Sequence, residues 1–240
     1  MTSRIVRLTG TDAVDHDHNN NGVASLERSC LEVIAILNER HEPVMAAQIV
    51  HWLRNCALAP SIMLALQRLE QKCLIRRDDT TVVHLTEAGN IAGANILRRR
   101  RLLERFLCDT LNVPWHEVYR EAKQLEPLLS PVMEARIAEM TSHATACPYG
   151  NPIPGRSETS PDEQLLVTAP INGWFIISRI DEEAGEDSCA LQFLWTRGLR
   201  PGTPLIRRPD AHDGMVVQRA DRHVILSRRI GRFLWGRNKL

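Results

Sequence analysis

The sequence has no hydrophobic run long enough to span a membrane and no closely paired cysteines. No apolar stretch approaches the roughly 20 residues that a transmembrane helix needs, and the first 22 residues lack the apolar core of a secretory signal. The six cysteines are scattered without a C-x-x-C pair, which favours buried thiols over disulfides. We therefore expect a cytoplasmic protein that does not bind a membrane.

The sequence also lacks an excess of charge of either sign. Lys and Arg total 30 and Asp and Glu total 29, so any attraction to nucleic acid must be local. Lysine is scarce, with Lys72, Lys123 and Lys239 as its only occurrences. At 240 residues the chain exceeds the usual size of one domain, which predicts two domains and a tail.

Recognisable catalytic motifs are missing as well. The chain has neither a P-loop nor a Rossmann glycine pattern, and His84, His116 and His143 have no serine or cysteine partner at a recognisable spacing. We therefore expect a protein that is not an enzyme.

Residues 25–88 have the pattern of a winged helix-turn-helix. Residues 1–24 are polar and predict a flexible tail. Apolar periodicity predicts helices over 26–40, 44–54 and 61–73, the last with Pro60 in its first turn. Strand-like segments follow at 74–75 and 82–85, around a polar turn. Helix, helix–turn–helix and a two-stranded ribbon form the plan of a DNA-reading unit.

The remainder of the chain predicts a helical domain and a β domain. Residues 98–130 read as two amphipathic helices joined at 112–114. A long helix from Gly89 runs into this stretch, and a further helix covers 131–140. We assign 89–145 to this helical domain and 146–163, rich in Pro and Gly, to a linker. Short β-rich runs in 164–240 predict a small all-β barrel of SH3 type.

Several segments together resemble the diphtheria toxin repressor family of iron- and manganese-dependent transcriptional repressors. The segments are HLTEAG after the wing, RRRLLERFL, VYREAKQLEPLLS, CPYGNPIPG and WTRGLRPGTPL. The resemblance implies a mainly α fold with a winged helix-turn-helix and a helical dimerisation domain, followed by an SH3-like barrel similar to ferrous-iron transport protein A. It also implies a homodimer that binds a double-stranded DNA operator.

The family's metal-binding pattern is altered in this sequence. A histidine of the family is replaced by Arg100, four residues before Glu104, and the family's ligand positions on the next helix read as Tyr119, Lys123, Glu126 and Pro127. The resemblance places further ligand positions at Ser29, Glu32 and near Asp187. Three carboxylates remain as a degenerate metal set, while every imidazole and the thiolate are gone, and arginine has no lone pair to offer a metal. The three carboxylates belong to Glu32, Glu104 and Glu126.

Two new cations accompany the lost ligands. We hypothesise that Arg100 and Lys123 replace the charge of a divalent ion and pair with Glu32, Glu104 and Glu126. We therefore expect no cofactor, with Mn²⁺ or Fe²⁺ at a non-standard site as the alternative. The competing interpretation is a set of separate solvated ion pairs, each contributing a few tenths of a kcal/mol.

The predicted recognition helix differs from the family's in its polar positions. Met63 and Leu64 stand where polar residues are expected, which indicates an altered operator because apolar side chains cannot form bidentate base contacts. Arg76 and Arg77 beside the wing offer phosphate contacts. The alternatives are a protein-interaction module and a redox- or haem-responsive regulator of the same descent. The predicted DNA contacts are Pro60, Ser61, Met63, Leu64, Gln67, Arg68, Arg76 and Arg77.

Overall fold

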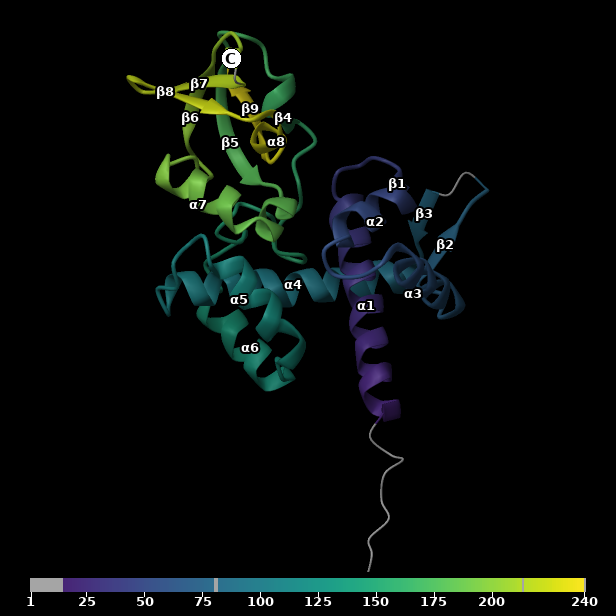
Figure 1. Ribbon diagram of the computed structural model, residues 1–240. Helices are drawn as coiled ribbons and strands as arrows, with labels where there is room; N and C mark the ends of the chain where they lie inside the picture. Colours follow the sequence, from purple (N-terminus) through teal and green to yellow (C-terminus); the bar gives the residue numbers. More distant parts are fainter. Residues whose placement is uncertain (1–14, 80–81, 213, 240) are drawn as a thin grey trace, which may run out of the picture. The chain divides into compact units, whose positions relative to one another are not determined.

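The computed structural model describes residues 15–79, 82–212 and 214–239 (Figure 1). Its contacts divide the chain into two units, Met1–Gly93 and Ala94–Leu240, with the boundary inside the long helix α4 (Glu87–Asp109). None of the helices in these ranges is both long and apolar enough to cross a membrane.

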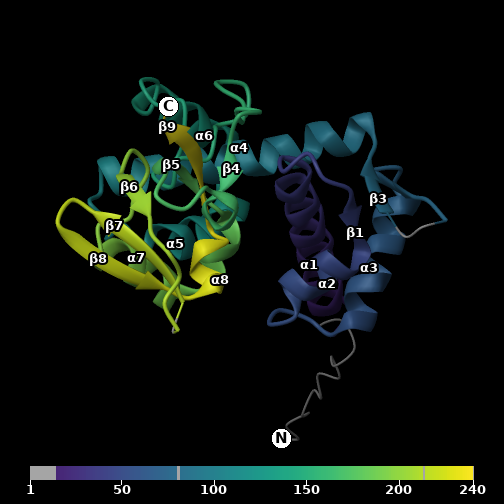
Figure 2. The ribbon, with the colours of Figure 1, turned by 90° about the horizontal axis from the view of Figure 1, so that it is seen from above.

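The first unit is a winged helix. Helices α1 (Asp15–Asn38), α2 (Ala46–Leu53) and α3 (Ala59–Gln71) contact one another (Figure 2). Strands β1 (Val44–Met45), β2 (Ile75–Arg77) and β3 (Val82–Leu85) form an antiparallel sheet in the order β1-β3-β2. The helices bury aliphatic side chains at helical spacing, and this burial holds the unit together. Its fully buried members include Ile34, Ile49, Leu53, Ile62 and Leu66.

Two boundaries in this unit differ from the sequence prediction. Helix α1 begins at Asp15 rather than near residue 26, so part of the expected tail is helical, while residues 1–14 lie outside the described residues. A polar composition lowers helix propensity by well under 1 kcal/mol per residue, which does not stop a packed helix from extending. Val44 and Met45 form a strand because they pair with Val83 and Val82.

The second unit begins with helices. After α4 come α5 (Val118–Leu125), the 3₁₀ turn η1 (Glu126–Leu128) and α6 (Pro131–Met140). Helix α6 follows the sequence prediction closely, because Pro131 occupies its first turn and the Ser130 hydroxyl accepts a hydrogen bond from the Met133 amide.

An antiparallel sheet completes this unit. Its described strands follow the order β4-β9-β5-β6-β7-β8. Helices and sheet share one hydrophobic core, in which Leu103 and Tyr119 cluster with Phe175 and Leu205. The fold class is therefore the expected one, mainly α with an SH3-like β portion. The elements are β4 (Gln164–Leu165), η2 (Leu166–Thr168), β5 (Trp174–Ile180), η3 (Glu182–Glu186), α7 (Ser188–Thr196), β6 (Pro204–Arg207), β7 (Met215–Arg219), β8 (Arg222–Leu226), α8 (Arg228–Gly231) and β9 (Leu234–Lys239).

Helix α7 corrects the sequence prediction, which placed a β-rich run there. The Asp187 side chain caps the helix by accepting a hydrogen bond from the Ala190 amide at 3.1 Å. Ala190, Leu191 and Leu194 then bury one face at a spacing of three and four residues. The capping residue, together with this spacing, was the overlooked signal.

Candidate functional site, a buried charge cluster and an exposed helix face

Helix α4 carries three charged residues into the interior of the second unit. The side chains of Arg100, Arg101 and Glu104 are at most 1% exposed. Arg100 and Glu104 lie one helical turn apart, with Nε and Oε1 separated by 3.4 Å. Buried charges of this kind persist only when they are paired, because an isolated ion loses its hydration on burial.

The second carboxylate of the cluster comes from η3, far along the chain. Glu182 Oε1 accepts a hydrogen bond from Arg101 Nε at 2.8 Å, and its Oε2 pairs with the Arg100 guanidinium. Arg101 also donates to the Pro152 carbonyl at 2.5 Å. Burial would raise the pKa of Glu182, but Arg100 and Arg101 outweigh burial and lower the pKa to about 2.

For Glu104, burial outweighs the effect of the neighbouring arginines on the pKa. Burial raises its pKa to about 7, because the neighbouring Arg100 only partly offsets the lost hydration and Glu182 adds a second negative charge. The Cys147 thiol lies beside the carboxyl, and burial holds the pKa of that thiol well above its usual range. Arg100, Arg101, Glu104 and Glu182 are called the buried charge cluster below.

Tyr119 on α5 covers the cluster and connects it to an outer ion pair. Its ring lies under two cations, with the Arg100 guanidinium carbon 5.0 Å and Lys123 Nζ 5.9 Å from the ring centroid. The Tyr119 hydroxyl donates to Glu186 Oε1 at 3.1 Å, and Lys123 pairs with the same carboxylate. Tyr119, Lys123 and Glu186 also line a cavity of about 390 Å³ at the surface.

Glu126 lies in a separate arrangement on η1. Its carboxylate pairs with Arg99 Nε at 2.9 Å, and Arg99 also contacts Glu134 at 3.6 Å and donates to backbone carbonyls of residues 126 and 129. Arg99 therefore ties α4 to η1 and α6.

The exposed face of α3 carries the predicted DNA contacts of the first unit. Pro60 sits in the first turn, Ser61 and Gln67 are exposed, and Met63 and Leu64 are 40% and 47% exposed.

The cations near α3 are mostly paired within the unit. Arg68 approaches Glu27 at 3.8 Å, and Lys72 pairs with the same buried carboxylate. Arg77 forms a 2.6 Å pair with Glu70, which lowers the pKa of Glu70. Arg76 is exposed.

Comparisons with known proteins agree with this fold. A family model described as "Iron dependent repressor, metal binding and dimerisation domain" matches residues 86–155. The iron-dependent repressor IdeR of Mycobacterium tuberculosis is 35% identical over 99 residues, 41% of this chain and 43% of that protein. The diphtheria toxin repressor of Corynebacterium efficiens is 26% identical over 177 residues, 68% of this chain and 77% of that protein.

A solved manganese-dependent transcriptional repressor in complex with manganese extends the likeness to the whole fold. It superposes with a TM-score of 0.75 at 24% identity, covering 89% of this chain and all of that one. Over these matched regions the chain is similar to the iron-dependent and diphtheria toxin repressors. The match with IdeR of Mycobacterium tuberculosis spans less than half of the length of that protein.

The family's metals do not fit the donors that the buried charge cluster offers. Within the described residues, no group of three or more His, Cys, Asp or Glu side chains is placed to hold a metal ion. Two guanidinium groups lie among the carboxylates of the cluster, and a guanidinium donates hydrogen bonds but cannot coordinate a cation. In the buried charge cluster, Arg100 and Arg101 compensate the charge of Glu182.

Some residues of the predicted charge network pair with partners other than those expected from the sequence. Arg100 pairs with Glu104 as expected, whereas Lys123 pairs with Glu186 and Glu126 pairs with Arg99. Glu32 is a largely buried residue of α1 in the first unit. The expected pairing of Glu32 with the second unit stays a prediction.

Sequence reasoning missed Arg101, Glu182 and Glu186. The resemblance pointed near Asp187 for the carboxylate of the β portion, but Asp187 caps α7 and pairs with Arg229 at 3.1 Å. Glu182 lies five residues earlier, and Asp181, which caps η3, fixes its position. The acidic run from Asp181 to Glu186 was the available signal.

Proposed function

We propose that the protein is a dimeric, DNA-binding transcriptional repressor whose assembly does not depend on a bound metal. The observation that carries this proposal is the buried charge cluster, in which Arg100 and Arg101 neutralise Glu182 inside a fold whose relatives are named for iron and manganese. The alternative within the family is Mn²⁺ or Fe²⁺ at a different place in the chain.

The winged helix supports the DNA-binding part. Helix α3 presents its exposed face beside a β2–β3 hairpin, which is the arrangement that places a helix in the major groove. Arg76 on the hairpin is exposed and suited to a phosphate contact that positions the unit without reading sequence.

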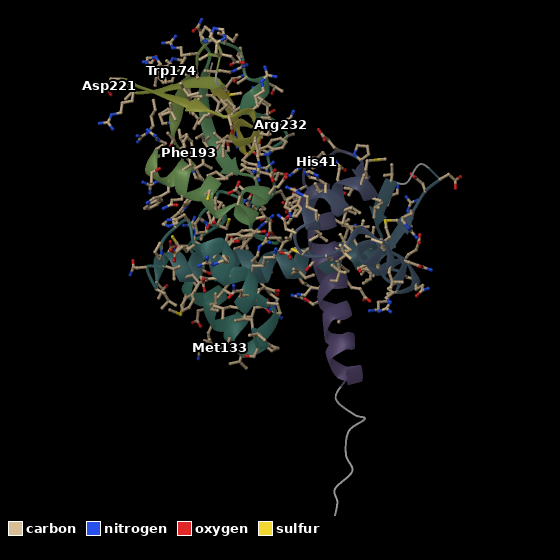
Figure 3. All side chains as sticks on the ribbon, viewed as in Figure 1. His41, Met133, Trp174, Phe193, Asp221 and Arg232 are labelled. Carbon is tan, nitrogen blue, oxygen red and sulfur yellow. The ribbon has the colours of Figure 1, made fainter. Side chains whose placement is uncertain are left out.

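Exposed apolar side chains on η1 and α6 support the dimer. Leu128, Val132, Met133 and Met140 are all more than half exposed, and Met133 projects outward from α6 (Figure 3). Apolar side chains gathered on one short segment are typical of an interface that a second copy covers.

The proposed division of the chain is 25–88 for DNA binding, 89–145 for dimerisation, 146–163 as a linker and 164–240 for the SH3-like domain, after a tail over 1–24. The proposal assigns no enzymatic activity and places the protein in the cytoplasm, with the DNA.

Binding to the DNA upstream of its own gene, with and without a chelator, tests the proposal. We expect a mobility shift that survives exhaustive chelation and that added Mn²⁺ or Fe²⁺ does not strengthen. The matched control is a Glu126→Gln variant, which removes a carboxylate of the degenerate metal set outside the buried charge cluster. A shift that requires either ion, and that Glu126→Gln abolishes, would restore metal dependence and overturn this part of the proposal.

A protein-interaction module is the second candidate, and one observation favours it. Acidic residues outnumber basic ones in residues 1–93, and the paired cations near α3 reduce the positive field further. Absence of binding to any duplex at low salt, where phosphate contacts are strongest, would favour this candidate over the repressor.

A further inference from the structure

The exposed face of α3 is apolar where it begins. Leu58, the residue that precedes the helix, is 77% exposed, and Met63 and Leu64 follow at 40% and 47%. The opposite face already supplies the core through Ile62, Ala65, Leu66 and Leu69. The exposed parts of Leu58, Met63 and Leu64 therefore form an apolar surface that is available to a ligand.

In the major groove, the 5-methyl group of thymine is the apolar feature that distinguishes one base pair from another. Met63 and Leu64 cannot donate or accept the paired hydrogen bonds that read guanine or adenine, but they pack against a methyl group. The unbranched Met63 side chain adapts its shape to such a contact.

Gln67 adds the complementary chemistry on the same face. It lies three residues after Leu64 and four after Met63, which places all three on one side of the helix. Gln67 is exposed, and a glutamine amide is suited to bidentate bonds with N6 and N7 of adenine, the partner of thymine.

Because the nearby cations are paired, the contacts with bases in the groove account for a larger share of DNA binding. Glu27 engages Arg68 and Lys72, and Glu70 engages Arg77, so few cations near α3 are left to bind phosphates. Sequence-independent attraction to the duplex is therefore small, and discrimination falls to the base edges.

We propose that Met63 and Leu64 read thymine methyl groups and that Gln67 reads the adenines paired with thymine. This inference rests on the proposed DNA-binding function and specifies how it is carried out. It assigns the protein to operators whose half-sites carry A·T pairs at the positions that face Met63, Leu64 and Gln67 of α3.

Selection from random duplexes, followed by removal of single methyl groups, tests the inference. We expect selected duplexes to be enriched in A·T pairs at the core of each half-site. Replacing a contacted thymine by deoxyuridine removes only the methyl group, and we expect a loss of about four-fold in affinity per methyl. Placing 5-methylcytosine opposite guanine at the same position should recover part of the methyl contact.

Two variants complete the test. Leu64→Asn, which keeps the approximate size of the side chain, should abolish the difference between thymine and deoxyuridine at the thymine that Leu64 contacts, while the thymine that Met63 contacts keeps its difference. Ile225→Ser, which removes an exposed apolar residue on β8, should leave it unchanged. Enrichment without any effect of deoxyuridine would overturn the inference while leaving DNA binding intact. If no duplex is selected even at low salt, the proposed function itself fails and the protein-interaction candidate takes its place.

Discussion

Arg101 Nε lies 2.8 Å from Glu182 Oε1, although the two residues are 81 positions apart in the chain. Neither side chain is more than 2% exposed. The pair joins α4 to η3 and hence the helices of the second unit to its sheet. Because both ions are desolvated, the pair contributes less to net stability than its geometry suggests, but loss of one partner leaves an uncompensated buried charge.

Glu182→Gln should therefore be strongly destabilising. Two arginines would lose their shared counter-ion, and we expect the free energy of unfolding to fall by about 3–5 kcal/mol, measured by urea denaturation at pH 7. The control is Glu139→Gln, which breaks an exposed pair with Arg136 and should cost less than about 1 kcal/mol. A loss in Glu182→Gln no larger than in the control would show that the cluster is solvated.

The same carboxylate predicts an acid transition. The folded pKa of Glu182, about 2, lies below its ordinary value of 4.5. Its stabilising contribution is therefore complete above pH 4.5 and is lost as the pH falls from there toward 2. Glu182→Gln should remove this part of the acid sensitivity, so wild type and variant should converge in stability at the lowest pH.

Glu104→Gln tests a shift of opposite sign. The folded pKa of Glu104 is raised from 4.5 to about 7, so the folded state retains a proton that the unfolded chain releases. The wild type should lose stability as the pH rises from about 4.5 to 7, by at most about 3 kcal/mol. Glutamine does not titrate. As the pH rises from about 4.5 to 7, the melting temperature of the wild type should therefore fall relative to that of Glu104→Gln. Parallel pH profiles for the two proteins would contradict the raised pKa.

Gly185→Ala tests how closely Tyr119 fits its surroundings. A Cβ atom at residue 185 would lie 2.4 Å from atoms of the Tyr119 ring, so the ring or η3 must move. Overpacking of this kind costs about 1–3 kcal/mol, measurable as a lower urea midpoint. Tyr119→Ala alone should also destabilise the fold, but adding Gly185→Ala to it should cost little more. If Gly185→Ala costs the same stability in the wild type and in Tyr119→Ala, contact with the Tyr119 ring is not the reason for a glycine at residue 185.

The sequence predicted the fold better than it predicted the site. Periodicity located α3 and α6, and Pro60 and Pro131 marked their first turns. The pairing of Val44 with Val83 depends on a contact between distant residues that no local pattern contains. The sequence predicts a β-rich run where α7 lies, because a short apolar run alone does not distinguish a helix from a strand.

The site was predictable only where its partners are close in sequence. Arg100 and Glu104 are one turn apart, so their contact follows from helical geometry. Glu182 approaches them only because the helices and the sheet share one core, and the acidic run from Asp181 to Glu186 does not by itself indicate which carboxylate points inward. The ion pair between Lys123 and Glu186 depends on the same packing.

Glu27→Gln should strengthen sequence-independent DNA binding. Glu27 is buried and holds Arg68 and Lys72 of α3, whose charges would otherwise be available to phosphates. Without the carboxylate charge, up to two additional phosphate contacts form, and the slope of log affinity against log salt concentration should steepen by up to roughly two. The measurement is titration of a non-operator duplex between about 50 and 200 mM salt, the range over which phosphate contacts change affinity most visibly.

The matched control for Glu27→Gln is Glu42→Gln, which removes the same charge from an exposed position in the same unit. A change in net charge alone would raise the affinity of both variants equally, with similar salt slopes. Release of Arg68 and Lys72 would steepen the slope in Glu27→Gln alone, because only freed cations displace additional counter-ions from the duplex. Identical slopes in the two variants would mean that Glu27 does not compete with DNA for these cations.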